Sequence, residues 1–413
     1  MTLNIEIFNK IVLIIFMVCY FYQFIYILIS LFPDKKKSIN DKKNHYAILI
    51  AARNEEAVIA NLINSINEQD YPSDYIDIYV GADNCNDKTA LIARSLGAIV
   101  YERYNHEQIG KGYVLNFLLN KIKESGKKYD GYIVFDADNV LDPAFIKEIN
   151  RVYNDGYEAV TSYRNSKNYG DNWLSAGYAL WYIHESCHLN AARMKMGVGC
   201  AINGTGFLFS QKLLDQYDGW NFFLLTEDIE FTIANVVNGF KVGYAKDAIL
   251  YDEQPTDFKQ SFYQRLRWSK GYLQVFKKYG LDLLKGIFNG SFACYDMTMN
   301  YAPAAILSFV SIVVNMIGII VIYLKNDSLY YLFSSLGALA FNMYLTLFII
   351  GVFTITTQWK RIYCSPLKKI LSVFTCPLFL LTYLPISIIA IFKKVSWTPI
   401  CHNRILTLNQ IKK

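Results

Sequence analysis

The eight cysteines of this 413-residue sequence include no C-x-x-C pair and form no dense cluster. Their spacing argues against a disulfide framework and favours a reducing, cytosolic setting for the globular part of the chain. The excess of positive over negative charge is also small, because 41 basic and 35 acidic residues leave a net charge of only +6. The surplus lies mostly in lysine clusters beside apolar runs, which indicates membrane topology, and we expect no nucleic-acid partner. No internal repeat is visible.

Hydrophobic residues make up 53% of the chain, which is above the usual share for a soluble domain. The excess is confined to residues 11–32 and most of 301–392, whereas 45–283 has the mixed composition of one globular domain. No small-x-small cleavage site follows the first run; a basic cluster does, made of Lys35, Lys36, Lys37, Lys42 and Lys43. We therefore expect an integral protein of the cell membrane, with the N-terminus outside and residues 34 onward in the cytoplasm.

From His45 onward, short aromatic and β-branched runs alternate with stretches of helical periodicity. The predicted strands are 46–51, 76–81, 98–101 and 132–135, and the predicted helices are 54–67, 87–96, 114–122 and 143–153. Strands that alternate with helices of this length predict an α/β fold, with a mostly parallel sheet and helices on both faces.

The strand at 132–135 ends in two aspartates, Asp136 and Asp138, separated by one residue. Ligands of open α/β sheets bind at the carboxyl ends of the strands, and two neighbouring carboxylates need a cation to hold them together. A hard divalent ion bound with a phosphate-bearing substrate would meet both conditions. The alternative for an isolated D-x-D pattern is a solvated turn.

Three further polar stretches favour a ligand site over a turn. Residues 51–56 follow the first strand, 81–87 follow the second, and 110–112 precede a helix. At the last of these, backbone N–H groups and the Lys111 ammonium would cradle phosphate. Together the stretches predict a nucleotide pocket with a metal at its mouth.

Two motifs lie further along the chain. Thr226-Glu227-Asp228 is typical of a helix N-terminus, with Thr226 as the cap and the acids favoured by the helix dipole. Residues 258–278 predict an amphipathic helix lying in the membrane interface, and Gln264, Arg267 and Trp268 share one of its faces.

The ordered set Asp83, Asp136-Ala137-Asp138, Thr226-Glu227-Asp228 and Gln264-x-x-Arg267-Trp268 resembles the signature of membrane-embedded family 2 glycosyltransferases. That group includes cellulose, hyaluronan, chitin and poly-N-acetylglucosamine synthases. The resemblance covers about residues 45–275. It implies a GT-A-type nucleotide-sugar-binding domain with Mg²⁺ or Mn²⁺ as cofactor.

The resemblance also implies a role for each matching residue. Asp228, with Glu227 beside it, would be the catalytic base. Asp138 would bind the metal, and Asp136 would help to orient metal and nucleotide. The residues that would bind the nucleotide-sugar are Ala51, Arg53, Glu55, Asp83, Lys111 and Asp136. Gln264, Arg267 and Trp268 would line the acceptor and diphosphate side.

The implied function is inverting, processive transfer of a sugar from UDP-glucose or UDP-N-acetylglucosamine to a β-linked polysaccharide, coupled to export. The partners would be the UDP-sugar, the growing polysaccharide, membrane lipid and accessory export subunits. One alternative is a non-processive enzyme that acts on a lipid-linked acceptor. Another is a zinc protease, because residues 184–188 match H-E-x-x-H, although no third ligand stands at a recognised spacing.

The C-terminal part predicts membrane spans at 301–324 and 329–353, joined by a turn at Lys325-Asn326-Asp327. A third candidate, 371–392, is interrupted by Pro377 and Pro385, so it either spans or re-enters. We expect five regions: a transmembrane helix (1–33), the cytosolic catalytic domain (34–255), interfacial helices (256–300), a transmembrane block (301–395) and a tail (396–413).

Overall fold

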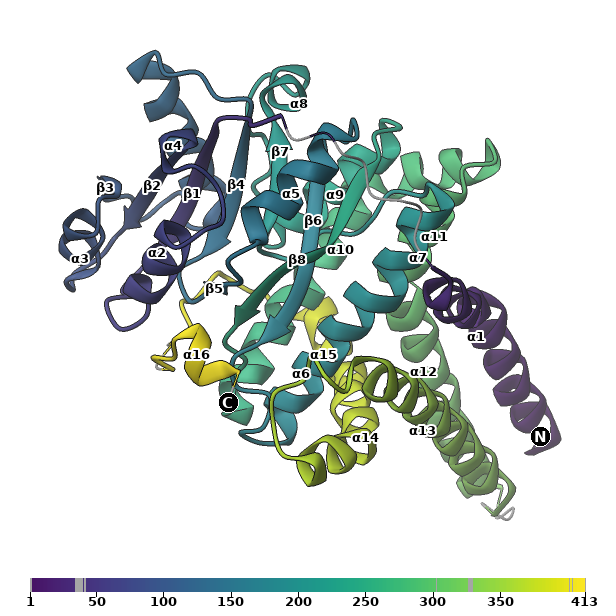
Figure 1. The fold of residues 1–413 in the computed structure, drawn as a ribbon. Helices are drawn as coiled ribbons and strands as arrows, with labels where there is room; N and C mark the ends of the chain where they lie inside the picture. The colour runs from purple at the N-terminus through teal and green to yellow at the C-terminus, as the bar shows by residue number, and fades with distance from the viewer. Residues whose placement is uncertain are drawn as a thin grey trace.

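The computed structural model of the protein describes residues 2–33, 40, 42–301, 303–325, 330–400, 402 and 404–412. The strands are β1 (Tyr46–Ala52), β2 (Ile76–Asp83), β3 (Ile99–Arg103), β4 (Gly131–Asp136), β5 (Val140–Leu141), β6 (Ala159–Ser166), β7 (Phe207–Ser210) and β8 (Val242–Asp252). They form one sheet in the order β3-β2-β1-β4-β7-β6-β8-β5 (Figure 1). β1 to β4 pair in parallel, as do β6 and β8, while β7 runs antiparallel to both of its neighbours. The predicted α/β class with a mostly parallel sheet is confirmed.

Helices cover both faces of the sheet. Those of the catalytic domain are α2 (Ile59–Asn67), α3 (Thr89–Ser95), α4 (Lys111–Ser125), α5 (Phe145–Asn154), α6 (Trp173–His184), α7 (Ala191–Met196), α8 (Gln211–Gln216) and α9 (Glu227–Val237). Successive side chains of a strand point to opposite faces, so Ala47 and Leu49 of β1 join the core beneath α4, α6 and α9. Ile48 and Ile50 join the core beneath α2, α3 and α5. A strand buried on both sides explains the unbroken apolar run in the sequence.

The predicted helix at 54–67 is wrong over its first turn, because α2 begins only at Ile59. Asn54 adopts a left-handed conformation, with φ of 56°. The backbone N–H of Glu55 donates to the Thr89 hydroxyl at 2.8 Å. This loop is tied to the loop after β2, and that leaves its polar side chains at the carboxyl edge of the sheet.

After the sheet, α10 (Phe258–Phe288) and α11 (Phe292–Tyr301) lead to the apolar helices α12 (Pro303–Leu324), α13 (Tyr330–Gln358), α14 (Pro366–Leu381) and α15 (Tyr383–Phe392). The apolar side of α10 is covered by protein, since its Leu266 packs with Ile386 and Ala390 of α15. The helix is therefore held by a tertiary contact as well as by any contact with lipid.

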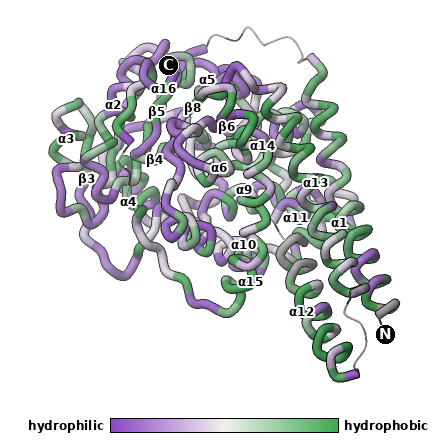
Figure 2. The backbone as a smooth tube through the Cα atoms, turned by 90° about the horizontal axis from the view of Figure 1, so that it is seen from below, coloured by the Kyte–Doolittle hydropathy of each residue, from purple (hydrophilic) through white to green (hydrophobic). Residues whose placement is uncertain are grey.

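The long helix α1 (Thr2–Leu31) packs beside α12 and α13 and projects away from the sheet with them (Figure 1). Much of α12 and α13 is green in Figure 2, the colour of hydrophobic residues. Among the described residues, three helical runs are long and apolar enough to cross a membrane: Ile5–Leu31, Leu332–Gln358 and Pro366–Phe392. The last includes Pro377 and Pro385, so the proline-containing segment does form a helical run of spanning length. The lysines at 35–37 and the turn residues Asn326 and Asp327 lie outside the described residues.

Candidate active site

One cavity of about 900 Å³ opens at the carboxyl ends of β1, β2 and β4. Its wall includes every residue that the sequence analysis assigned to the site: Ala51, Arg53, Glu55, Asp83, Lys111, Asp136, Asp138, Glu227, Asp228, Gln264, Arg267 and Trp268. Carboxyl ends of parallel neighbouring strands meet at one edge of a sheet, which explains how motifs far apart in the chain converge. The convergence is an observation; the role of each side chain stays a prediction.

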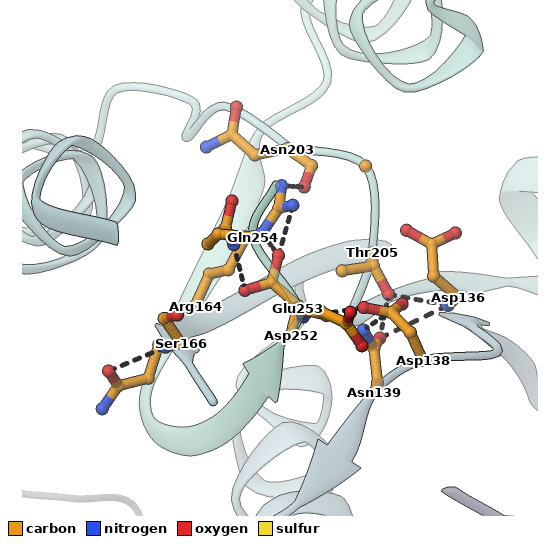
Figure 3. A network of polar contacts seen from close by, with 12 residues as sticks. Asp136, Asp138, Asn139, Arg164, Ser166, Asn203, Thr205, Asp252, Glu253 and Gln254 are labelled. Atoms are coloured by element: carbon orange, nitrogen blue, oxygen red, sulfur yellow. Dashed lines mark hydrogen bonds and ion pairs between the residues drawn. The ribbon is translucent and has the colours of Figure 1, made fainter. Parts of the chain in front are cut away.

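Asp136 is the last residue of β4, and Asp138 follows it in the next turn; both belong to a dense polar network (Figure 3). The Asp136 N–H donates to the Thr205 hydroxyl at 2.9 Å, and the Asp138 carboxylate accepts the Glu253 N–H at 2.7 Å. Burial opposes ionisation of Asp138, but the nearby positive charges of His402 and Lys167 outweigh it and lower its pKa. Asp138 is thus a buried carboxylate held in its charged form.

The start of α4 carries the Gly110-Lys111-Gly112 motif. The Lys111 ammonium donates to Asp136 Oδ1 at 2.5 Å and to the Gly204 carbonyl at 2.7 Å. Gly112 allows this helix to lie close to the loop before α9, because a Cβ there would be 2.1 Å from the Phe222 carbonyl oxygen. A cation and a helix N-terminus therefore stand beside the first aspartate, where they can stabilise phosphate charge.

Asp83, at the end of β2, is buried and ion-paired with Arg103 of β3 at 2.5 Å. The Arg103 guanidinium also donates to the Gln108 carbonyl at 2.8 Å. The pairing fixes the orientation of the Asp83 carboxylate at the cavity wall. No pattern in the sequence indicated this partner.

The two acids at the start of α9 face the cavity from a different side. Burial, and then the charge of Asp228, raise the pKa of Glu227 to about 7. Burial also raises the pKa of Asp228, while the cations of Lys111 and Arg267 act against it. A Cβ on Gly204 would be 4.0 Å from Asp228 Oδ2, which puts this carboxylate close to the loop that Lys111 contacts.

Thr226 does not cap α9 through its side chain, contrary to the sequence-based prediction. It occupies the position before the helix, but its hydroxyl is buried and has no hydrogen-bond partner among the described residues. The side chain is packed against Gly271 of α10, where an added Cβ would approach it to 2.5 Å. Close packing between α9 and α10 takes precedence over the cap.

Gln264, Arg267 and Trp268 line the cavity from a single face of α10, as their spacing predicts. Arg267 donates to the Leu225 carbonyl at 2.8 Å, which ties this helix to the loop before α9. The Trp268 ring stands edge-on to Tyr178 of α6, with 5.8 Å between the ring centroids. The tryptophan is thus part of the cavity wall.

The C-terminal tail supplies wall residues that sequence reasoning missed. Trp397 lies against Arg53, with 5.4 Å between the guanidinium carbon and the ring centroid. The His402 imidazole contacts both carboxylate oxygens of Glu55 at 3.0 Å. Beyond it, α16 (Leu408–Ile411) packs through Ile411 near β5 and β8. The sequence offered only a tryptophan and a histidine after the last apolar run, and such a signal does not predict where the tail lies.

The H-E-x-x-H pattern falls at the end of α6 and in the π-helical segment Glu185–Asn190 that follows. His184 Nδ1 contacts the Thr354 hydroxyl at 3.1 Å, and the two ring nitrogens of His188 contact Ser30 and Thr357 hydroxyls at 2.7 and 3.2 Å. Within the described residues no group of three or more His, Cys, Asp or Glu side chains is placed to hold a metal. The histidines join the catalytic domain to α1 and α13.

The cavity extends away from the nucleotide end between the apolar helices. Here its wall is made of side chains from α1, α13 and α15: Leu13, Phe16, Met17, Phe21, Phe24, Met343, Thr346, Leu347, Ile350 and Leu384. We call this part the apolar arm. It joins the space beside Asp228 to helices that are apolar enough to cross a membrane.

A divalent metal fits the donor set at Asp136 and Asp138. Asp138 is buried and held ionised, and Asp136 stands two residues away at the same strand end. Mg²⁺ is usually bound by one or two carboxylates, with water and substrate phosphates completing its coordination.

The sheet, the strand-end acids and the cavity define a GT-A-like transferase domain. Residues 43–271 match the family model described as glycosyltransferase like family 2, so the chain belongs to glycosyltransferase family 2. Its GT-A-like domain is therefore a glycosyltransferase domain. PcManGT, a mannosyltransferase from Pyrobaculum calidifontis solved with GDP-Man and Mn²⁺, shares the fold. The TM-score is 0.56 with 14% sequence identity, and the match covers 93% of this chain and 98% of PcManGT.

The curated relatives that the chain matches carry the names of several different glycosyltransferases. The chain is 26% identical over 238 residues to β-monoglucosyldiacylglycerol synthase of Synechocystis sp., covering 56% of this chain and 48% of that protein. It is 23% identical over 253 residues to glucomannan 4-β-mannosyltransferase 1 of Oryza sativa, covering 58% and 47%. A probable glycosyltransferase of Bacillus subtilis, YdaM, is 25% identical over 265 residues, covering 58% of each chain. The chain spans about half the length of such relatives.

Proposed function

We propose that this enzyme moves one sugar at a time from a UDP-sugar to a hydroxyl group of a membrane lipid, with inversion at the anomeric carbon. The apolar arm is the observation that carries the proposal, because it leads from Asp228 to helices of membrane-spanning character. A lipid acceptor would keep its acyl chains among these apolar side chains while its headgroup reached the acids. The Synechocystis relative, named β-monoglucosyldiacylglycerol synthase, supports a glycolipid product.

The acids and cations divide the chemistry between them. The acceptor hydroxyl must lose a proton as it attacks, and Asp228 at the cavity wall is placed to take it. Negative charge then grows on the departing diphosphate, and Lys111 and Arg267 stand where they can offset it. A bound Mg²⁺ or Mn²⁺, held by Asp138 with Asp136, would supply further charge neutralisation for the diphosphate. One base and a direct displacement give a β-linked product from an α-linked donor.

The residues at the sheet end of the cavity would bind and orient the UDP-sugar donor. Asp83, fixed by Arg103, offers acceptor oxygens to a uracil edge, and the Arg53–Trp397 pair lies at the same end of the wall. We also propose that this end faces the cytoplasm, where nucleotide-sugars are available and where the positive-inside rule puts the catalytic domain.

The second candidate is processive synthesis of a β-linked polysaccharide with export. Gln264, Arg267 and Trp268, together on the wall, favour it, because a tryptophan ring provides a flat face for a sugar. The glucomannan relative supports it by name. The apolar arm is the reason to rank it second, since a polysaccharide has no use for an apolar lining.

In the decisive experiment, the protein in lipid vesicles is incubated with one radiolabelled UDP-sugar at a time and Mn²⁺. The reaction is then extracted with organic solvent. We expect label in a small, extractable lipid. Thr346→Trp, which adds bulk at the wall of the apolar arm, should reduce that product, whereas Leu345→Trp, on the neighbouring residue outside the cavity lining, should not. Label that appears only in material of high molecular mass would refute the lipid acceptor and support the polysaccharide.

A further inference from the structure

Glu185 is a charged side chain inside the cavity that none of the roles above uses. It is the first residue of the π-helical segment and is 4% exposed, yet it lines the cavity wall. Burial raises the pKa of its carboxyl, while nearby Arg193 and the side chains of Asn203 and Asn300 act against that rise. π-Helical turns are rare and occur often at functional sites. Asn203 and Asn300 hydrogen-bond this carboxylate, and an ionised carboxylate has further lone pairs with which it can accept hydrogen bonds from a ligand in the cavity.

Glu185 and Asp228 face the same space. Both residues line the cavity. The Asn203 side chain hydrogen-bonds Glu185, and a Cβ added to the next residue, Gly204, would be 4.0 Å from Asp228 Oδ2. One short loop therefore contacts the surroundings of both carboxylates. A ligand group that reached the base would therefore come close to a second carboxylate.

Unused hydrogen-bonding groups surround this space. Thr226 Oγ1, Gln264 Oε1 and the Tyr301 hydroxyl are each buried without a hydrogen-bond partner among the described residues, and all three residues line the cavity. Leaving such groups unpaired costs about 1–3 kcal/mol each. A ligand rich in hydroxyl groups would satisfy them, because a hydroxyl can both donate and accept.

The charge around this space does not suit an anionic ligand. The cations beside Glu185 are already matched to carboxylates, Arg164 to Asp252 and Arg193 to Asp296. Lys111 and Arg267 are the cations assigned above to the diphosphate. Glu185, Glu227 and Asp228 together make the acceptor side acidic. A phosphate headgroup would be repelled there, whereas a neutral polyol would not.

We propose that Glu185 binds a non-reacting hydroxyl of the acceptor while Asp228 takes the proton of the reacting one. The acceptor is then a neutral lipid whose headgroup carries several hydroxyls, such as a hexosyl-diacylglycerol. This inference rests on the proposed lipid acceptor and narrows it. Diacylglycerol, with one hydroxyl, and polyprenyl phosphate, with an anionic headgroup, would be poorer substrates. Glu185 is an acceptor-binding residue in this scheme, and the proton transfer itself does not pass through it.

The test compares wild type, Glu185→Gln and Glu68→Gln in vesicles that contain hexosyl-diacylglycerol, diacylglycerol or undecaprenyl phosphate. Glu68 is an exposed glutamate just past α2 and controls for loss of a charge. We expect E185Q to raise KM for hexosyl-diacylglycerol about tenfold, the loss of one charge-assisted hydrogen bond. KM for the UDP-sugar and slow hydrolysis of the donor should not change. With diacylglycerol, E185Q and wild type should behave alike.

A second variant guards against misfolding of the first. Tyr301→Phe removes only the unpartnered hydroxyl and should likewise raise KM for hexosyl-diacylglycerol without affecting the donor. Wild-type KM values in both variants, or better use of undecaprenyl phosphate than of the glycolipid, would overturn the role of Glu185 alone. Failure of wild type to label any of the lipids, with donor hydrolysis intact, would overturn the lipid acceptor and this inference with it.

Discussion

Replacing Asp228 by asparagine tests the chemistry most directly. The substitution keeps the shape of the side chain but removes its ability to accept a proton. Positioned general bases contribute about 10²–10⁴-fold to rate, which corresponds to about 3–5 kcal/mol of transition-state stabilisation. We expect kcat to fall within that range in D228N. KM for the donor should stay close to wild type, because the nucleotide end of the cavity is built from other strands.

The neighbouring acid gives this prediction a second, independent readout. The pKa of Glu227 is raised to about 7 by burial and then by the charge of Asp228. In wild type the rate should rise with pH up to about 7, as the last proton leaves this pair of acids. In D228N the repulsion is gone, so the pKa of Glu227 should fall and the residual activity should peak at lower pH.

The assay is release of UDP together with product formation across a pH series, with Asp74→Asn as the control. Asp74 is an exposed aspartate before β2, far from the catalytic acids in sequence. Full activity in D228N would refute the assignment of the base. A large loss with an unshifted pH profile would show that the two acids are not electrostatically linked.

Two other perturbations should separate binding from folding. Trp397→Ala and His402→Ala remove tail contacts with the nucleotide end of the cavity, and we expect KM for the UDP-sugar to rise with little change in Tm; an unchanged KM would mean that the tail is only a cover. Asp296→Asn leaves Arg193 buried without its ion-pair partner, both side chains being 0% exposed. We expect this substitution to cost about 3–5 kcal/mol of stability and to lower Tm. The exposed Asp282→Asn should leave Tm unchanged, and equal effects of the two substitutions would contradict the argument from burial.

The α/β class could be predicted from the sequence because apolar runs and polar turn residues alternate regularly along the chain. Buried strands read as continuous apolar runs, and each ends in polar residues at a strand terminus that parallel pairing brings to one edge. Asp83, Asp136 and Asp138 could thus be predicted to converge without knowledge of any contact. Gln264 and Trp268 could be put on one face because the helical repeat is regular.

Where two elements compete for the same side chain, local rules failed. The sequence predicts Thr226 as a helix cap, but its side chain packs against Gly271 of α10 and its hydroxyl makes no capping hydrogen bond. The helix predicted from Asn54 starts later, because the loop is bonded to the next strand's loop instead. Both outcomes depend on partners far away in the chain, and no local pattern encodes such partners.

What the sequence by itself determined was the α/β class, which depends on spacing within single strands and helices, and the set of acids, which its resemblance to a known family pointed out. Only the tertiary structure decided that the tail's His402 contacts Glu55, and that Glu185 of an H-E-x-x-H pattern faces the cavity while its histidines bond to hydroxyls of α1 and α13. The reason is physical: a side chain's chemistry follows from its surroundings, and surroundings are set by packing between segments that the linear pattern leaves unconnected.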